Sequence, residues 1–432
     1  MRARDNVRGS GDTMALRGRS RLWLTVFLGI MTAIAPLSTD MYLPALPEVQ
    51  ADFGVSTSLI QMTLTMTTLG MALGQILAGP LSDLWGRKKP LFIGMLVFIG
   101  ATLGCVLAED IDYFLFFRFF VGFAGASGIV IARAIARDVC EGAELTRFFA
   151  VLMMVNGLAP ILAPVIGGQI LLFASWRATF VLLTLIGVGL AAATLAYSET
   201  LAKEARSSNV TDSLKKFPIL LKNRYFLGHC LVQCFVFGAF FCYLAGSSFI
   251  FQNIYAVSPQ AYSLIFGAIG LGLLVTGVLP ARLAGRVPDV RLLKYAVLVP
   301  LLGSILLLTG FYFTAPLLVI VFPLCGSVLL LAGFVFSAPI AAILVILFVT
   351  VVPLSVMGAA SFSLALSRQG KNAGSASALI GGSSMLLGAC MMPVVGIAGD
   401  HTALPMAIIM VTLYALGALV FFSMIAPEHR AV

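Results

Sequence analysis

Charged residues are scarce in this chain. Of its 432 residues, only 10% are charged and 60% are hydrophobic, and the mean hydropathy is +1.04. A soluble domain carries about 25% charged residues. This shortage excludes an ordinary soluble protein and predicts a polytopic membrane protein, which buries apolar surface in lipid as well as in itself. It also leaves no basic soluble domain that could bind nucleic acid, although the net charge is +9.

Motifs for enzymatic chemistry are missing as well. The chain has no P-loop, no Ser/His/Asp arrangement and no convergent set of metal ligands. We therefore expect no enzyme, no ATP-driven step, no cofactor and no metal. The seven cysteines lie mostly within apolar runs, where they are expected to be small packing residues and not a disulfide framework.

The distribution of positive charge predicts the topology. Lys and Arg cluster before the first apolar run, at 203–224 and near the C-terminus, whereas the loops at 109–112 and 400–401 are acidic or nearly neutral. This alternation follows the positive-inside rule. It places the N-terminus, the middle loop and the C-terminus in the cytoplasm.

Apolar runs long enough to cross a bilayer, about 20 residues each, form two groups around a charged linker. A weak sequence similarity between "SDLWGRKK" and "ARLAGRVP" suggests that the two halves are related. Related halves with the binding site between them are typical of transporters. The expected parts are a basic cytoplasmic N-terminus (1–21), an N-terminal six-helix bundle (22–198), a cytoplasmic linker (199–224), a C-terminal six-helix bundle with an extra segment (225–427) and a cytoplasmic tail (428–432).

The extra apolar segment comes from a tandem duplication at 300–340. "PLLGSILLLTGFYFTAPL" (300–317) and "PLCGSVLLLAGFVFSAPI" (323–340) are identical at 12 of 18 positions at a fixed offset of 23. The flanking basic residues on both sides are expected to be cytoplasmic, which requires an even number of crossings. We therefore predict that one apolar segment between 295 and 366 is re-entrant, peripheral or interfacial.

The stretch "GPLSDLWGRKKP" (79–90) resembles the loop after the second span of the major facilitator superfamily. The matching residues include Gly79, Asp83, Gly86, Arg87 and Lys88. The resemblance implies a cytoplasmic gating loop. Asp83 is expected to accept from backbone N–H groups at a helix N-terminus or from a nearby arginine. A plain charged turn is the alternative.

A second stretch, "NGLAPILAPVIGG" (156–168), resembles the fifth-span motif associated with antiporters. The matching residues are Gly157, Pro160, Pro164, Gly167 and Gly168, while Ala163 stands where many members have glycine. Small residues let helices approach closely and prolines kink them. Ordinary glycine-rich helix packing is the alternative.

Further stretches resemble the Bcr/CflA branch of drug:proton antiporters, the bicyclomycin and chloramphenicol resistance type. They are "STDMYLPALP", "ARAIARDV", "ETL" after the sixth span and "NAGSASALIGG". The stretch "FFRFFVGFAGASG", which contains Arg118, resembles the fourth-span motif of an arginine followed by small residues. The resemblance implies an all-α membrane protein with the major facilitator fold, two six-helix bundles around a central cavity. It also implies a monomer that exports small amphipathic drugs or metabolites in exchange for protons across the bacterial inner membrane.

Asp40 is the only charge in residues 22–46. An ionised carboxylate at the bilayer centre costs about 3 kcal/mol on insertion scales. At 1.5 Å per residue, Asp40 and Arg118 lie roughly 6 Å and 8 Å below the same surface, so the two charges are expected to pair. We hypothesise that Asp40 carries the transported proton and that Arg118 modulates it. A static pair, or a helix cap before Pro44, is the alternative.

Other polar and aromatic residues at membrane depth are candidates for the cavity: Gln61, Asn156, Gln233 and Phe237. These side chains could equally form helix–helix hydrogen bonds or contact lipid. For the whole chain, a proton-coupled symporter of a small metabolite and a non-transporting membrane receptor are the competing functions.

Overall fold

The computed structural model describes residues 18–140, 142–201, 217–283, 286–313, 338–367, 369 and 373–430. These residues form helices and the turns between them. Eleven helical segments in this part of the chain are long and apolar enough to cross a membrane, and α6 adds a shorter apolar stretch over 154–170. Together they make twelve crossings.

The first six crossings form the N bundle. Its close packing depends on small residues: Gly70 of α3 lies against the carbonyl of Phe119, and Gly122 of α5 lies against the carbonyl of Thr67. The elements are α1 (Gly18–Asp40), the 3₁₀ turn η1 (Leu43–Ala45), α2 (Leu46–Phe53), α3 (Thr57–Trp85), α4 (Lys88–Leu107), α5 (Ile111–Val139), α6 (Gly142–Ile170) and α7 (Arg177–Ala196).

The second six crossings form the C bundle. Its elements are α8 (Phe217–Lys222), α9 (Arg224–Phe249), the π-helical turn η4 (Ile250–Ile254), α10 (Pro259–Gly277), α11 (Leu279–Leu283), α12 (Asp289–Phe313), α15 (Ala338–Val351), α16 (Leu354–Ser367), α17 (Ala373–Val395), η7 (Gly396–Ala398), α18 (Leu404–Val420), η8 (Phe421–Ile425) and α19 (Ala426–Arg430). One crossing is made by α15 and α16 together, with a break at Val352 and Pro353.

Two described crossings flank the duplicated region: α12 contains most of the first copy, and the crossing made by α15 and α16 begins at the end of the second copy. α12 runs antiparallel to α15–α16, since Ser363 donates to Asp289 (3.2 Å) near one end and Gly303 packs on Thr350 further along. Most of the second copy falls in 314–337, outside the described residues, so its peripheral placement stays a prediction. Most of the N-terminus, the linker and the C-terminal tail also lie outside them.

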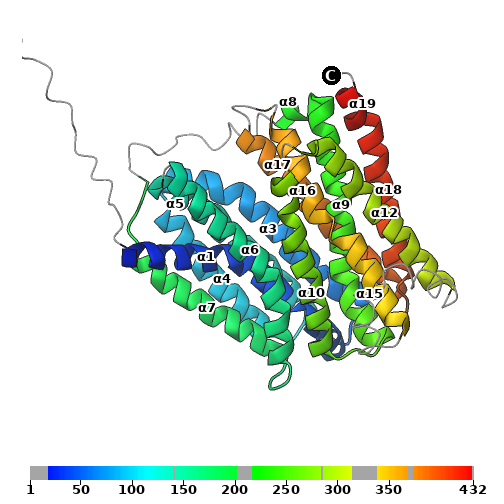
Figure 1. The fold of residues 1–432 in the computed structure, drawn as a ribbon. Helices are drawn as coiled ribbons and strands as arrows, with labels where there is room; N and C mark the ends of the chain where they lie inside the picture. The colour runs from blue at the N-terminus through cyan, green and yellow to red at the C-terminus, as the bar shows by residue number, and fades with distance from the viewer. Residues whose placement is uncertain are drawn as a thin grey trace, which may run out of the picture.

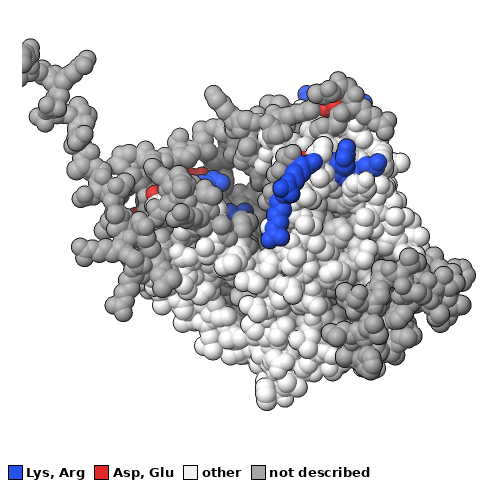
Figure 2. Space-filling model, in the orientation of Figure 1, with Lys and Arg blue, Asp and Glu red and all other residues white. Residues whose placement is uncertain are grey.

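The two bundles meet where α3 packs on α17 and α6 packs on α10. Figure 1 shows that they come together at one end and lean apart toward the end that carries the C-terminus. Figure 2 shows that Lys and Arg on this face gather toward that same end, while the other end is free of them. We call these the basic end and the opposite end.

Candidate functional site

A break in the first crossing positions Asp40. α1 ends at Asp40, and a 3₁₀ turn with Pro44 follows before α2 begins. In a continuous helix the carbonyl of Leu43 would accept from residue 47, but Pro47 has no N–H. The backbone N–H of Leu46 donates to the carbonyl of Leu43 within the 3₁₀ turn. Side chains of the C bundle add further donors: Ser248 donates to the carbonyl of Leu43 (2.7 Å), and Gln252 donates to that of Pro44 (3.0 Å). The break is therefore held by the other bundle.

Asp40 lines a cavity of about 160 Å³ between the bundles. Its side chain is otherwise enclosed, since the residue is only 7% exposed. The N bundle contributes Pro36, Thr39, Asp40, Thr68, Met71 and Pro160 to the wall, and the C bundle contributes Phe240, Phe241, Tyr243, Leu244, Phe266, Ile269, Gly270, Leu273 and Met385. Because both bundles form the wall, a change in their relative tilt changes the cavity.

Hydrogen bonds from neutral side chains close the cavity toward the opposite end. Among the described residues, Ser58, Gln61 and Thr65 of α3 donate to the carbonyls of Pro393, Ala245 and Ala389 at 2.8, 3.1 and 2.8 Å. Gln260 donates to the carbonyl of Gly168 (3.1 Å) beside the bonds made by Ser248 and Gln252. These six bonds join the two bundles, and we call them the seam.

Toward the basic end the cavity is closed by a thinner neck. Gln75 of α3 contacts the sulfur of Met385 (3.5 Å). Gly157 of α6 lies against the side chain of Leu274 on α10. Beyond this neck the bundles lean apart (Figure 1). Among the described residues, six hydrogen bonds thus close the opposite end, whereas the contacts of this neck close the cavity toward the basic end.

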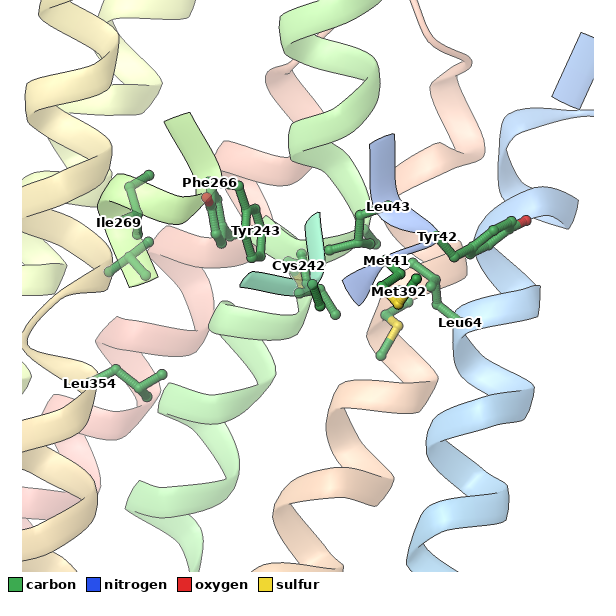
Figure 3. Close-up of a cluster of buried hydrophobic side chains, with 14 of the residues drawn as sticks. Met41, Tyr42, Leu43, Leu64, Cys242, Tyr243, Phe266, Ile269, Leu354 and Met392 are labelled. Carbon is green, nitrogen blue, oxygen red and sulfur yellow. The ribbon is translucent and has the colours of Figure 1, made fainter. Parts of the chain in front are cut away.

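Two tyrosines of the C bundle lie close to Asp40. Tyr243 stacks on Phe266, with ring centroids 5.7 Å apart and planes at 10°. Figure 3 shows this pair together with Met41 and Leu43 at the break in the first crossing. Tyr243 lines the cavity together with Asp40, and Tyr262 packs beside this wall, with its ring centroid 6.1 Å from that of Phe266. Sequence reasoning missed both tyrosines, and the only available signal was a polar group within an apolar run.

Arg118 does not pair with Asp40. No ion pair joins them among the contacts of the described residues; the fully buried guanidinium donates instead to the carbonyl of Ser38 (2.9 Å). It also lies over the ring of Tyr42, 4.7 Å from its centroid. The last carbonyls of a helix carry partial negative charge and lack intrahelical donors. The expected pair is thus absent because Arg118 caps α1 while Asp40 faces the cavity.

The predicted gating loop is mostly helix. α3 continues to Trp85, so Gly79 and Asp83 lie within it, and only Gly86, with φ +88°, turns the chain. Arg87 then donates to Asp83 and to Asp138 of α5 (2.8 Å). The arginine alternative for Asp83 is therefore the one observed.

Glu199 supplies the cap at the start of α4. Its carboxylate accepts from the backbone N–H groups of Arg87 (2.8 Å) and Lys88 (3.2 Å). Partial burial opposes its ionisation, but these bonds and those from the next two residues outweigh burial and lower the pKa of Glu199. The carboxylate therefore ties the end of α7 to the start of α4.

Arg87→Ala is expected to destabilise the protein by about 2 kcal/mol. The substitution removes the positive partner of two carboxylates, the mostly buried Asp138 and the half-exposed Asp83. Thermal unfolding in detergent measures this change. Exposed Lys89→Ala on the same turn is the matched control and should leave the midpoint unchanged. Equal midpoints for Arg87→Ala and wild type would show that the cluster is not stabilising.

The span-five motif lies along the junction between the bundles. Pro160 lines the cavity, and Pro164 is buried in the same helix. Gly167 lies against the carbonyl of Met41, the residue after Asp40, and Gly168 lies against Ser263 of α10. A Cβ at either glycine would collide with these atoms. The motif therefore brings α6, the break and the C bundle into one contact.

The four candidate cavity residues do not line this cavity. Gln61 faces the other bundle, where it donates to the carbonyl of Ala245 in the seam. Gln233 is buried within the C bundle, and Phe237 packs against Phe240 (6.5 Å) behind the wall. Asn156 is half-buried one turn from Pro160. Phe240 and Phe241, one turn further along α9, line the cavity in their place.

Comparison with known proteins decides the family. Residues 28–370 match the Major Facilitator Superfamily. The chain belongs to this superfamily. It is 31% identical to the bicyclomycin resistance protein homolog of Haemophilus influenzae, over 92% of this chain and 94% of that protein. It is 37% identical to an uncharacterized transporter of the superfamily from Bacillus subtilis, over 94% and 96% of the two chains.

The fold agrees with solved members. The crystal structure of a D-xylose-proton symporter superposes with a TM-score of 0.72 at 14% identity, covering 94% of this chain and 98% of that one. The predicted fold class and the resemblance to the drug-resistance branch are confirmed. This protein is a multi-pass membrane transporter of the major facilitator superfamily.

Proposed function

We propose that this transporter exports small amphipathic molecules in exchange for protons, with Asp40 as the proton carrier. One observation carries the proposal. Asp40 lies at the break in the first crossing and faces a cavity whose wall comes from both bundles. A protonatable group in that position changes its surroundings whenever the bundles rock, which is the requirement for coupling proton binding to alternating access.

The seam defines what must change in one transport cycle. Opening the opposite end breaks six hydrogen bonds of neutral groups, each worth about 1 kcal/mol net. Asp40 is the only carboxylate in the cavity wall formed by the described residues. Its protonation removes a charge from an apolar site and is therefore the step that can bias closure.

Arg118 acts in this scheme through the backbone of α1. By holding the carbonyl of Ser38, it fixes the turn that carries Asp40. A shift of α5 along α1 would bring the guanidinium toward the carboxylate and favour its ionised form. Arg118 is therefore a positioning residue in the structure described and a modulator in the cycle we propose.

The basic end is proposed to face the cytoplasm of a bacterium. Arg87 and Lys88 in the turn after α3, Arg224 at the start of α9 and Arg282 in α11 lie at this end, and the positive-inside rule favours the cytoplasmic side for them. Both termini are then cytoplasmic and the protein lies in the inner membrane. Since one chain forms the whole cavity, we propose that a monomer transports.

A susceptibility panel in an efflux-deficient bacterial host tests this function. Expression is expected to raise resistance to a subset of drugs, and an uncoupler should remove the difference in drug accumulation. Inverted vesicles separate the mechanisms: uptake on acidifying the lumen indicates an antiporter. Cotransport of drug and proton in the same direction would identify a symporter, and no flux at all would identify a receptor.

A further inference from the structure

The size of the cavity limits what can occupy it. Its volume is about 160 Å³, and an engineered apolar cavity of about 150 Å³ binds benzene. Pockets for drug-sized ligands measure about 300–1,000 Å³. In its sealed form the cavity therefore holds one six-membered ring with a short substituent.

The charge of the cavity selects among single-ring compounds. Asp40 makes no hydrogen bond with another described residue, and Arg118 is turned away from it toward Ser38. An ionised carboxylate that is nearly buried without a partner is costly. A ligand with an ammonium group supplies both the opposite charge and the missing donors, whereas a carboxylate ligand meets repulsion.

The aromatic rings of the wall come from one bundle. Phe240 and Phe241 of α9 and Phe266 of α10 line the same cavity as Asp40 but belong to the C bundle. The ring of Phe241 rests on Gly388, where a Cβ would occupy its place, so the glycine leaves room for it. Rings of this kind bind an aromatic ligand by offset or edge contacts. The wall is thus acidic on the N bundle and aromatic on the C bundle.

From this arrangement we infer that the cavity binds a small, monovalent aromatic amine with a single ring. The ammonium group is held by Asp40 of the N bundle, and the ring lies against Phe240, Phe241 and Phe266 of the C bundle. Such a ligand bridges the two bundles and stabilises the sealed form. This substrate class rests on the transport function proposed above.

Calorimetry on the full chain in nanodiscs tests the inference with three matched probes: 2-phenylethylammonium, neutral 2-phenylethanol and anionic phenylacetate. The amine is expected to bind about 10- to 100-fold more tightly than the alcohol, because a charge-assisted hydrogen bond in a buried site contributes a factor of that size. Phenylacetate should bind more weakly than either. Equal affinity for the amine and the alcohol would overturn the inference.

Variants identify the two halves of the site. Asp40→Asn should remove the preference for the amine and leave the affinity for 2-phenylethanol unchanged. Phe266→Leu should weaken both probes. Leu273→Ala shortens a side chain of the wall and so enlarges the cavity, which should then bind the two-ring amine tryptamine. Phe235→Leu, on the face of α9 that packs near Gly417, is the control and should change no affinity. Retention of the amine preference by Asp40→Asn would overturn the assignment.

Transport assays distinguish failure of this inference from failure of the proposed function. Amine binding that depends on Asp40, without flux driven by a pH gradient, supports the substrate class and contradicts proton-coupled export. Flux of another compound driven by a pH gradient, without binding of the amine, overturns the substrate class and leaves proton-coupled export standing.

Discussion

Asp40→Asn is expected to reduce export driven by a pH gradient to the level of vesicles without the protein. Asn keeps the shape of the side chain and its place in the cavity wall, but it cannot bind or release a proton. Exchange of an uncharged substrate in the absence of a gradient should persist, because the bundles still rock. Accumulation ratios in proteoliposomes at fixed inner and outer pH measure the effect.

Two further variants make this result specific. Asp40→Glu keeps a titratable group at the break and should retain part of the accumulation. Asp112→Asn removes an exposed carboxylate in the first turn of α5, far from the cavity wall, and should transport like wild type. An Asp40→Asn protein that still accumulates substrate to the wild-type ratio would exclude Asp40 as the proton carrier.

Gly167→Ala is expected to have the next largest effect. The added Cβ would overlap the carbonyl oxygen of Met41, a backbone atom that cannot move without displacing Asp40. Overpacking of this kind costs about 1–3 kcal/mol. We expect transport to fall by about 10-fold and the opposite end to become more accessible, which reaction of a cysteine placed in the seam with an impermeant reagent would report.

Gly189→Ala is the matched control for that variant. It makes the same change in α7, where no atom lies within 4 Å of the new Cβ. Its transport, and its reactivity in the same cysteine background, should equal those of wild type. If Gly167→Ala also behaved like wild type, the contact between α6 and the break would not be needed for the cycle.

The crossings and the superfamily could be predicted from the residues alone, and so could the position of one carboxylate, Asp40, within the first apolar run. The free energy of placing a residue in lipid depends mainly on that residue and its neighbours along the chain. An isolated carboxylate in an apolar run such as 22–46 is therefore visible without a structure. The charged linker and the motif at 79–90 are likewise local patterns, and the comparisons bear out the family that they indicated.

The partners of these residues were not predictable in the same way. Asp40 and Arg118 lie at similar depth, yet the rotation of α5 directs the guanidinium to the carbonyl of Ser38. Gln61 was a candidate for the cavity, but the bundles approach closely there, so it donates to the carbonyl of Ala245 and does not line the cavity. Glu199 caps α4 across 112 positions of sequence. Depth and helical face follow from sequence, whereas contacts depend on tilt and rotation.

The membrane crossings and the cost of a carboxylate at Asp40 could be recognised from the residues alone, since both follow from transfer of single residues between water and lipid. Tertiary packing decided the rest: an aromatic wall in the same cavity as Asp40, a seam of neutral hydrogen bonds and an arginine that caps a helix. Each of these requires two distant helices to meet at a particular rotation, and that rotation is set by the close packing of all the helices together.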